Sequence, residues 1–186
     1  MTFYNKYRMK IIQSKLQDCC YVQSDVYKDD RGLFNKTYHQ EIFKQEDINV
    51  DIKEQFYTVS DKNVLRGMHF QLPPYHHDKL VSCLSGSIID VVLDLRKSSS
   101  TYRQFDVFKL KENDGKVIYI PSGMAHGFLS LKDNSGVLYN TSEIHNQKFD
   151  SGIHWDSFGF DWKCDSPIVS KRDQKNMLLN QFKTPF

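Results

Sequence analysis

The sequence predicts an all-β protein, built as an antiparallel sandwich or barrel. Short runs rich in Val, Ile, Leu, Phe and Tyr are separated by turn residues at fairly even spacing, which is typical of antiparallel strands joined by tight turns. Aromatic residues make up 13% of the 186 residues, with 13 Phe and 10 Tyr against only 9 Gly. This balance favours a folded, β-rich chain over a disordered one.

The first 50 residues are expected to form an N-terminal β arm with edge strands. Residues 1–28 alternate loosely between apolar and polar positions, which indicates one or two edge strands. Residues 29–32, DDRG, have the composition of a turn. Residues 38–50 are the best early candidate for a short helical turn.

Residues 51–162 are expected to form the core of the barrel. A turn at Ser85-Gly86 divides one long apolar run into two strands. Pro73-Pro74 ends the strand before it, because proline cannot donate a hydrogen bond to a ladder. The predicted strands cover residues 53–59, 64–71, 80–96, 103–110, 117–120, 126–131 and 137–142.

Residues 163–186 are expected to form a C-terminal tail with a short helix. Ser170 and Asp173 have the spacing of a capping box, and the predicted helix continues through residues 177–179. Residues 1–186 are long enough for one sizeable core and contain no repeat or low-complexity linker. We therefore interpret the chain as a single domain.

Composition excludes several classes of partner. The net charge is only +2, so there is no bulk attraction to nucleic acid. No apolar run reaches membrane-spanning length, and the first twenty residues lack the apolar core of a signal peptide. The four cysteines form no C-x-x-C pair. We expect free thiols in a reducing cytoplasm, with neither nucleic acid nor a membrane as partner.

The apolar run at residues 64–71, VLRGMHFQ, contains the first candidate site residues. Strand alternation would place His69 on one face of the strand and Arg66 on the other. Gly67 can break this alternation and allow Arg66 to reach the same pocket. A buried His beside a surface Arg is an equally good interpretation of this segment alone.

A second motif points to a particular type of barrel. Four residues with the spacing G-x5-P-x-G-x2-H resemble the second signature motif of the cupin jelly rolls: Gly115, Pro121, Gly123 and His126. Metal-binding cupins take further ligands from an upstream H-x-H…E motif, but here Gln71 stands at the second His and Lys79 at the Glu. An ammonium group would repel a divalent cation, so no metal is expected.

The candidate residues have the properties needed to remove and return a proton beside a carbonyl. A neutral His69 is a competent base near pH 7, and Lys79 can stabilise an oxyanion. Tyr139 can donate a proton, although a tyrosine on a half-buried strand is also common in protein cores. Asp173 either orients His69 or belongs only to the capping box.

Taken together, the motifs resemble the dTDP-4-dehydrorhamnose 3,5-epimerases. The resemblance extends from about Asp30 to Asp173, and it depends on several motifs in the right order. These are DRGLF at 30–34, VLRGMHFQ at 64–71, KLV at 79–81, DVVLDLR at 90–96, IPSGMAHGF at 120–128, GIHWD at 152–156 and SKRD at 170–173.

The resemblance implies a cofactor-free, cupin-type jelly-roll homodimer that acts in surface-polysaccharide assembly. Its substrate would be a nucleotide-diphosphate-linked 4-keto-6-deoxy sugar, epimerised at carbons 3 and 5. By position, His69 would be the base with Asp173 as its partner. Tyr139 would be the acid on the opposite face, and Lys79 would stabilise the enolate. The residues implied to hold the substrate are Arg31, near the dimer interface, and Gln55, Arg66, His126, His145, Asp150 and Arg172.

The departures from the family pattern gather at the nucleotide end of the predicted site. Lys36 stands where the family has Glu, and Tyr57 stands where an Asn follows the residue matched to Gln55. His145 takes the place of the aromatic residue that stacks on thymine. Asp150 replaces a Glu and Arg172 a Lys. We hypothesise that the nucleobase, and with it the sugar, differs from dTDP-hexose; a GDP-linked 4-keto hexose or heptose is the candidate.

Three alternatives remain open from the sequence. The enzyme could invert carbon 3 alone instead of carbons 3 and 5. A 3,4-ketoisomerase on the same barrel would return the proton on the same face and would not need Tyr139. A non-catalytic nucleotide-sugar-binding jelly roll would need no base at all.

Overall fold

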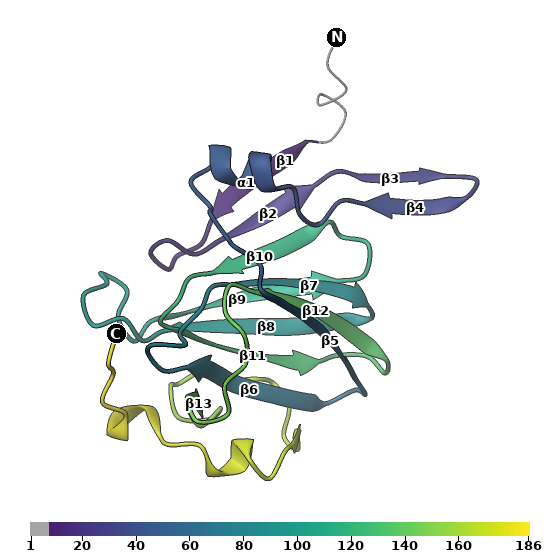
Figure 1. Ribbon diagram of the computed structural model, residues 1–186. Coiled ribbons are helices and arrows are strands. Elements are labelled where there is room, and N and C mark those ends of the chain that lie inside the picture. The colour runs from purple at the N-terminus through teal and green to yellow at the C-terminus, as the bar shows by residue number, and fades with distance from the viewer. Residues whose placement is uncertain (1–7) are drawn as a thin grey trace.

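Two sheets packed face to face form the body of the molecule (Figure 1). The structure, a computed structural model, describes residues 8–186. The first sheet has the order β1 (Met9–Gln13), β2 (Cys20–Ser24), β10 (Lys116–Ile120), β7 (Lys79–Ser85), β12 (Ser135–Thr141) and β5 (Glu54–Ser60). The second has the order β13 (Asp150–Gly152), β6 (Val64–Gln71), β11 (Met124–Ser130), β8 (Ser87–Asp94) and β9 (Phe105–Lys111). The short β14 (Ile168–Val169) pairs in parallel with β6.

The predicted all-β class is confirmed, and the predicted core strands correspond to β5–β12. The turn at Ser85-Gly86 separates β7 from β8, as the sequence indicated. The candidate helical turn is α1 (Gln40–Gln45). In the N-terminal arm, β1 forms the edge of the first sheet, while the part of that prediction in residues 1–7 lies outside the described residues.

The predicted C-terminal helix, which continues through residues 177–179, is not present as one continuous helix. Two single-turn 3-10 helices replace it, η2 (Asp173–Lys175) and η3 (Leu179–Gln181). The Ser170 hydroxyl accepts the backbone N–H of Asp173 at 3.0 Å, as a capping box requires. The helix nevertheless stops after one turn, and Met177 instead forms a bridge with Ile153 beside the barrel. Contacts with the barrel therefore outweigh the local helical preference.

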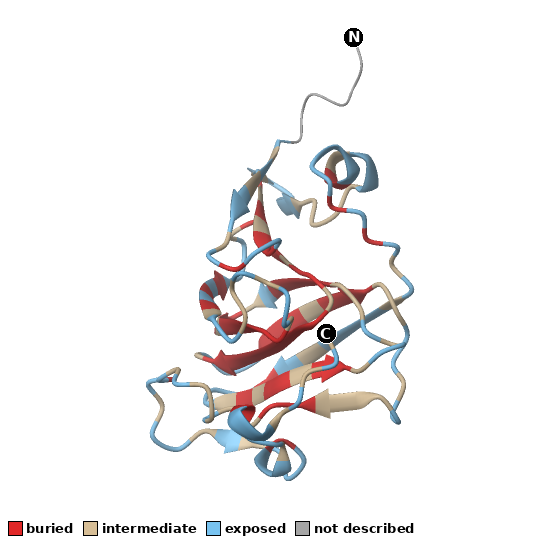
Figure 2. Ribbon diagram, turned by 90° about the vertical axis from the view of Figure 1, so that its left-hand side faces the viewer, coloured by how far each residue is buried: buried red, intermediate tan, exposed pale blue. Residues whose placement is uncertain are grey.

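Three apolar clusters hold these layers together. One lies between the sheets and includes Val81, Val92 and Phe128. The outer face of the second sheet packs against the C-terminal tail through Trp162 and Leu179, and a third cluster packs α1 against the outer face of the first sheet. Figure 2 shows that buried residues concentrate in the strands of the barrel. No helix among the described residues is long and apolar enough to cross a membrane.

One hairpin stands apart from the barrel. Strands β3 (Val26–Asp29) and β4 (Gly32–Asn35) pair only with each other and project away from the two sheets (Figure 1). The DDRG turn predicted from the sequence is at its tip, with Gly32 at φ +120°. Leu33 and Phe34 are 40% and 48% exposed, so this hairpin presents apolar surface to its surroundings.

Candidate active site

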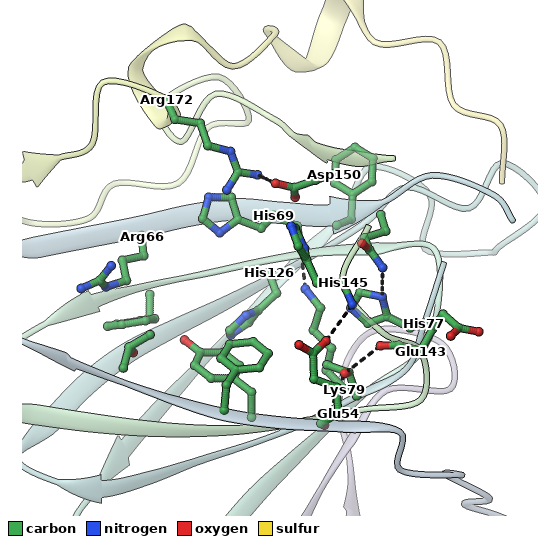
Figure 3. A pocket seen from close by; sticks show the side chains of 17 residues that line it. Glu54, Arg66, His69, His77, Lys79, His126, Glu143, His145, Asp150 and Arg172 are labelled. Atoms are coloured by element: carbon green, nitrogen blue, oxygen red, sulfur yellow. Dashed lines mark hydrogen bonds and ion pairs between the residues drawn. The ribbon is translucent and has the colours of Figure 1, made fainter. Parts of the chain in front are cut away.

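A cavity of about 240 Å³ opens between the two sheets (Figure 3). The second sheet lines it from β6 and β11, and the first sheet from β5, β7 and β12. The fold brings these sequence-predicted residues to its wall: Arg66, His69, Lys79, His126, Tyr139, His145, Asp150 and Arg172.

A bulge in β6 places Arg66 and His69 on the same wall. His69 pairs with His126 of β11, whereas Arg66 pairs with Phe128, so β6 contains one extra residue between these pairs. Gly67, at the bulge, has φ +137°, and a Cβ on it would lie 2.5 Å from the Cα of Gly127. Only glycine satisfies both conditions, which explains why the expected alternation is broken here.

His69 and Asp173 form a hydrogen-bonded pair. The imidazole Nε2 is 2.7 Å from Oδ1 of Asp173, and the other carboxylate oxygen accepts the backbone N–H of Gly67 at 3.2 Å. Burial alone would raise the pKa of Asp173, but the hydrogen bonds from His69 and Gly67 outweigh it and hold the pKa below its usual range. Burial lowers the pKa of His69, and Asp173 offsets only part of this effect. At neutral pH the pair is therefore a neutral imidazole beside a carboxylate.

Lys79 lies on β7, across the cavity from His69, and is only 8% exposed. Its Nζ donates to the backbone carbonyl of His69 at 3.0 Å. Burial lowers the pKa of Lys79 to about 8, although Asp150 and Asp90 partly oppose this shift. Lys79 is thus a cation at neutral pH whose charge is poorly solvated, and such a charge interacts strongly with a developing anion.

Tyr139 of β12 is held by two rings on the wall opposite His69. Phe56 stacks on it with 4.7 Å between ring centroids and 14° between planes. His126 meets its edge at 5.9 Å. Burial raises the pKa of the Tyr139 hydroxyl above its ordinary value, so the group remains a proton donor across the neutral range.

Asp90 is a site residue that the sequence reasoning did not single out. It is fully buried on β8, and its Oδ2 is 2.7 Å from Nε2 of His126. A carboxylate within the apolar run SIIDVVLD was the available signal, because a buried charge requires a polar partner. By accepting the Nε2–H, the carboxylate of Asp90 fixes the tautomer of His126.

Gln55 does not reach the cavity, which corrects its predicted role. Its side-chain amide donates to Oδ1 of Asn140 at 2.5 Å. Asn140 is in turn the cross-strand partner of Leu80, whose side chain packs in the cluster between α1 and the outer face of the first sheet. Because side chains alternate along β5, Glu54 and Phe56 point inward instead. The match of Gln55 to a substrate-binding position was therefore displaced by one residue. Tyr57 also faces outward, with 68% of its surface exposed.

Arg31 also lies outside the cavity of its own chain. It is at the tip of the β3–β4 hairpin, where its side chain is 90% exposed and pairs only locally with Asp29. Arg172 lines the cavity and forms an ion pair with Asp150 at 2.6 Å. Gln71, which stands at a metal-ligand position of other cupins, uses its amide to hold the loops at Tyr75 and Asn146. Within residues 8–186, no three His, Cys, Asp or Glu side chains converge as metal ligands would.

The fold and this cavity define a sugar epimerase of the cupin type. The sequence model described as dTDP-4-dehydrorhamnose 3,5-epimerase matches residues 13–181. The chain belongs to this family and is an isomerase. The dTDP-4-dehydrorhamnose 3,5-epimerase of Methanothermobacter thermautotrophicus is 36% identical over 170 residues, covering 89% of this chain and 91% of the relative.

Solved structures agree with this assignment. The enzyme of the same name from Bacillus anthracis, with TDP and PPi bound, superposes with a TM-score of 0.89 at 30% identity, covering 92% of this chain and 100% of the other. The dTDP-6-deoxy-D-glucose-3,5-epimerase of Legionella pneumophila, in complex with dTDP-4-keto-L-rhamnose, gives 0.90 at 27% identity with 95% of each chain covered.

Proposed function

We propose that this enzyme inverts carbon 3, or carbons 3 and 5, of a nucleotide-diphosphate-linked 4-keto-6-deoxy sugar. The observation that carries the proposal is the position of base and acid on opposite walls. His69 belongs to β6 of one sheet and Tyr139 to β12 of the other. A sugar ring held between them would lose a proton from one face and gain one on the other, which is inversion.

The chemistry follows from the charge state of each group. Neutral His69 takes the proton from the carbon beside the ketone, and Asp173 stabilises the imidazolium that forms. Lys79 stabilises the enolate oxygen. Tyr139 then donates its hydroxyl proton to the same carbon from the opposite wall. The resulting tyrosinate and imidazolium exchange protons with solvent, which restores the starting state.

We infer that the site is completed by a second copy of the chain. Arg31 is presented on a projecting hairpin that makes no contact with its own cavity. The outward face of edge strand β5 carries Tyr57 and Val59, which are 68% and 53% exposed. A homodimer would cover this apolar face and bring a guanidinium to the partner's diphosphate. Sedimentation equilibrium tests it: a monomer at micromolar concentration would contradict it.

We also place this enzyme in the cytoplasm, in surface-polysaccharide assembly. Its four cysteines are free thiols, which suits a reducing compartment, and the family resemblance suggests the pathway. The test of activity is deuterium uptake in heavy water with dTDP- and GDP-linked 4-keto-6-deoxy sugars. We expect label at carbon 3, or at carbons 3 and 5, that His69→Ala abolishes. A folded protein that binds nucleotide and incorporates no label from any substrate would instead be a binding module.

A further inference from the structure

Three carboxylates line the mouth and wall of the cavity, and they differ in their partners. Asp150 is paired with Arg172 at 2.6 Å. Glu143 is paired with Lys53 at 2.8 Å, and the hydrogen bond from this lysine lowers the pKa of Glu143. Glu54 forms no ion pair with any cation in residues 8–186. Its Oε2 accepts only the backbone N–H of His145, at 2.7 Å.

Glu54 therefore presents a free acceptor to the cavity. Among the described residues, none donates a hydrogen bond to Oε1 of Glu54, while the side chain lines the cavity (Figure 3). A ligand that covers this oxygen removes it from water. Binding is then unfavourable unless the ligand supplies a hydrogen-bond donor, because a buried unpaired carboxylate is costly.

The position of Glu54 relates it to the nucleotide rather than to the reacting sugar. Glu54, Thr141 and Lys79 are cross-strand neighbours on β5, β12 and β7. Two strand spacings separate Glu54 from Lys79, about 10 Å. His145, whose backbone Glu54 holds, is exposed at the cavity mouth. With the sugar ring between His69 and Tyr139, a nucleoside that extends toward the mouth would pass Glu54.

Phosphate oxygens cannot satisfy this carboxylate, because both groups only accept hydrogen bonds and both are negative. Thymine and uracil offer one donor, the N3–H, and the carbonyl oxygens on either side of it repel a carboxylate. Cytosine carries an amino donor on N4, adenine one on N6 and guanine one on N2. Guanine also places its N1–H beside that amine, so that two donors face one carboxylate. The unpaired carboxylate thus discriminates among bases by their donors.

We propose that Glu54 determines nucleobase specificity by accepting a hydrogen bond from an exocyclic amino group. The enzyme would then prefer a sugar linked to a guanine, adenine or cytosine nucleotide over one linked to a thymine nucleotide. The proposal rests on the proposed function, since it requires the cavity to hold a nucleotide-linked sugar. It adds the identity of the residue that selects the base.

Calorimetric titration of the full-length protein with GDP, ADP, CDP, dTDP, UDP and dGDP tests the proposal. We expect GDP, ADP or CDP to bind at least tenfold more tightly than dTDP and UDP, and the tightest of the three identifies the base. dGDP should bind within threefold of GDP. The proposal is overturned if dTDP or UDP binds as tightly as the amino-bearing nucleotides. It is also overturned if dGDP binds much more weakly than GDP while UDP binds as tightly as GDP. The last pattern would mean that the ribose diol, not the base, is recognised.

The variant Glu54→Gln separates base recognition from a structural role. The amide oxygen of Gln can still accept the His145 N–H, but it replaces the free acceptor by a donor. We expect the preference for the amino-bearing nucleotide to fall at least tenfold with an unchanged melting temperature. Glu143→Gln is the matched control, because that carboxylate already has Lys53 as its partner. An unchanged preference in Glu54→Gln overturns the proposal.

These outcomes are distinct from failure of the proposed function. If no nucleoside diphosphate binds at millimolar concentration, the nucleotide-sugar assignment and this inference both fail. If dTDP binds most tightly, the epimerase assignment stands and only the role of Glu54 is rejected.

Discussion

His69 and Asp173 are 104 residues apart in the sequence, yet Nε2 of one lies 2.7 Å from Oδ1 of the other. The imidazole is on β6 inside the barrel, and the carboxylate is on the first 3-10 turn of the C-terminal tail. The tail packs on the outer face of the same sheet, so its docking delivers the partner of the base. The same side chain also accepts the N–H of Gly67, at the bulge that aims His69 inward.

Asp173→Asn should lower kcat without unfolding the protein. The amide retains the shape of the side chain but cannot stabilise an imidazolium, so we expect a loss of about 10²–10⁴-fold. Epimerisation followed by NMR measures the rate, and circular dichroism confirms the fold. A correctly folded variant with the full rate would show that Asp173 serves only the tail.

Tyr139→Phe should separate proton removal from inversion. His69 remains able to abstract the proton, so exchange of the substrate proton with deuterium should continue, while inverted product falls at least 100-fold for want of the acid. Comparing label uptake with product configuration by NMR measures both. Tyr102→Phe, in a loop outside the cavity, is the control. Undiminished inversion in Tyr139→Phe would mean that another group is the acid, whereas an undiminished shift of the keto group to carbon 3 would favour a 3,4-ketoisomerase.

The rate should depend on pH through Lys79 and His69. Stabilising the enolate requires protonated Lys79, so kcat/KM should fall as pH rises through about 8. The base must be neutral, and the lowered pKa of His69 places the acidic limb below pH 6.5. Tyr139 does not contribute to the basic limb, because its pKa is raised above its usual value. A profile that is flat up to pH 10 would contradict the role of Lys79.

Lys79→Met should inactivate the enzyme and stabilise its fold. The pKa of Lys79 falls from 10.5 to about 8 on folding, so the unfolded chain binds more protons between these values and the charged form opposes folding by about 3 kcal/mol below pH 8. Loss of the hydrogen bond to the His69 carbonyl destabilises the fold by about 1 kcal/mol and so offsets part of this gain. At pH 7 we expect a rise of about 4–8 °C in melting temperature. Calorimetry at pH 10.5 is the internal control, where the gain should vanish.

Gly67→Ala should be much more damaging than the same change at another glycine with positive φ. Its Cβ would meet the Cα of Gly127 at 2.5 Å, whereas a Cβ on Gly159 meets nothing within 4 Å. We expect Gly67→Ala to cost about 3 kcal/mol or more and Gly159→Ala about 1 kcal/mol. Urea denaturation measures both free energies. Equal losses in the free energy of unfolding would mean that β6 and β11 can move apart at the bulge to accommodate the Cβ.

Local patterns were enough to predict most of the strands. The turn at Ser85-Gly86, the short helix near Phe43 and the DDRG hairpin all depend on residues close in sequence. The C-terminal helix was predicted wrongly because Ser170 and Asp173 have a local capping pattern, while the residues that follow are drawn onto the barrel. The local capping pattern contains no information about the contacts with the barrel that compete with helix formation.

The sequence by itself determined the β architecture, the family and the main catalytic candidates, because these depend on short-range periodicity and on motifs with fixed spacing. Only the tertiary structure decided which side chains share the cavity. It moved Gln55 to the outer face, brought Glu54 and Phe56 inward, and paired Asp90 with His126. The physical reason is that a shift of one residue along a strand reverses the direction of every side chain. Register is fixed by pairing with distant strands, and so the local sequence does not determine it.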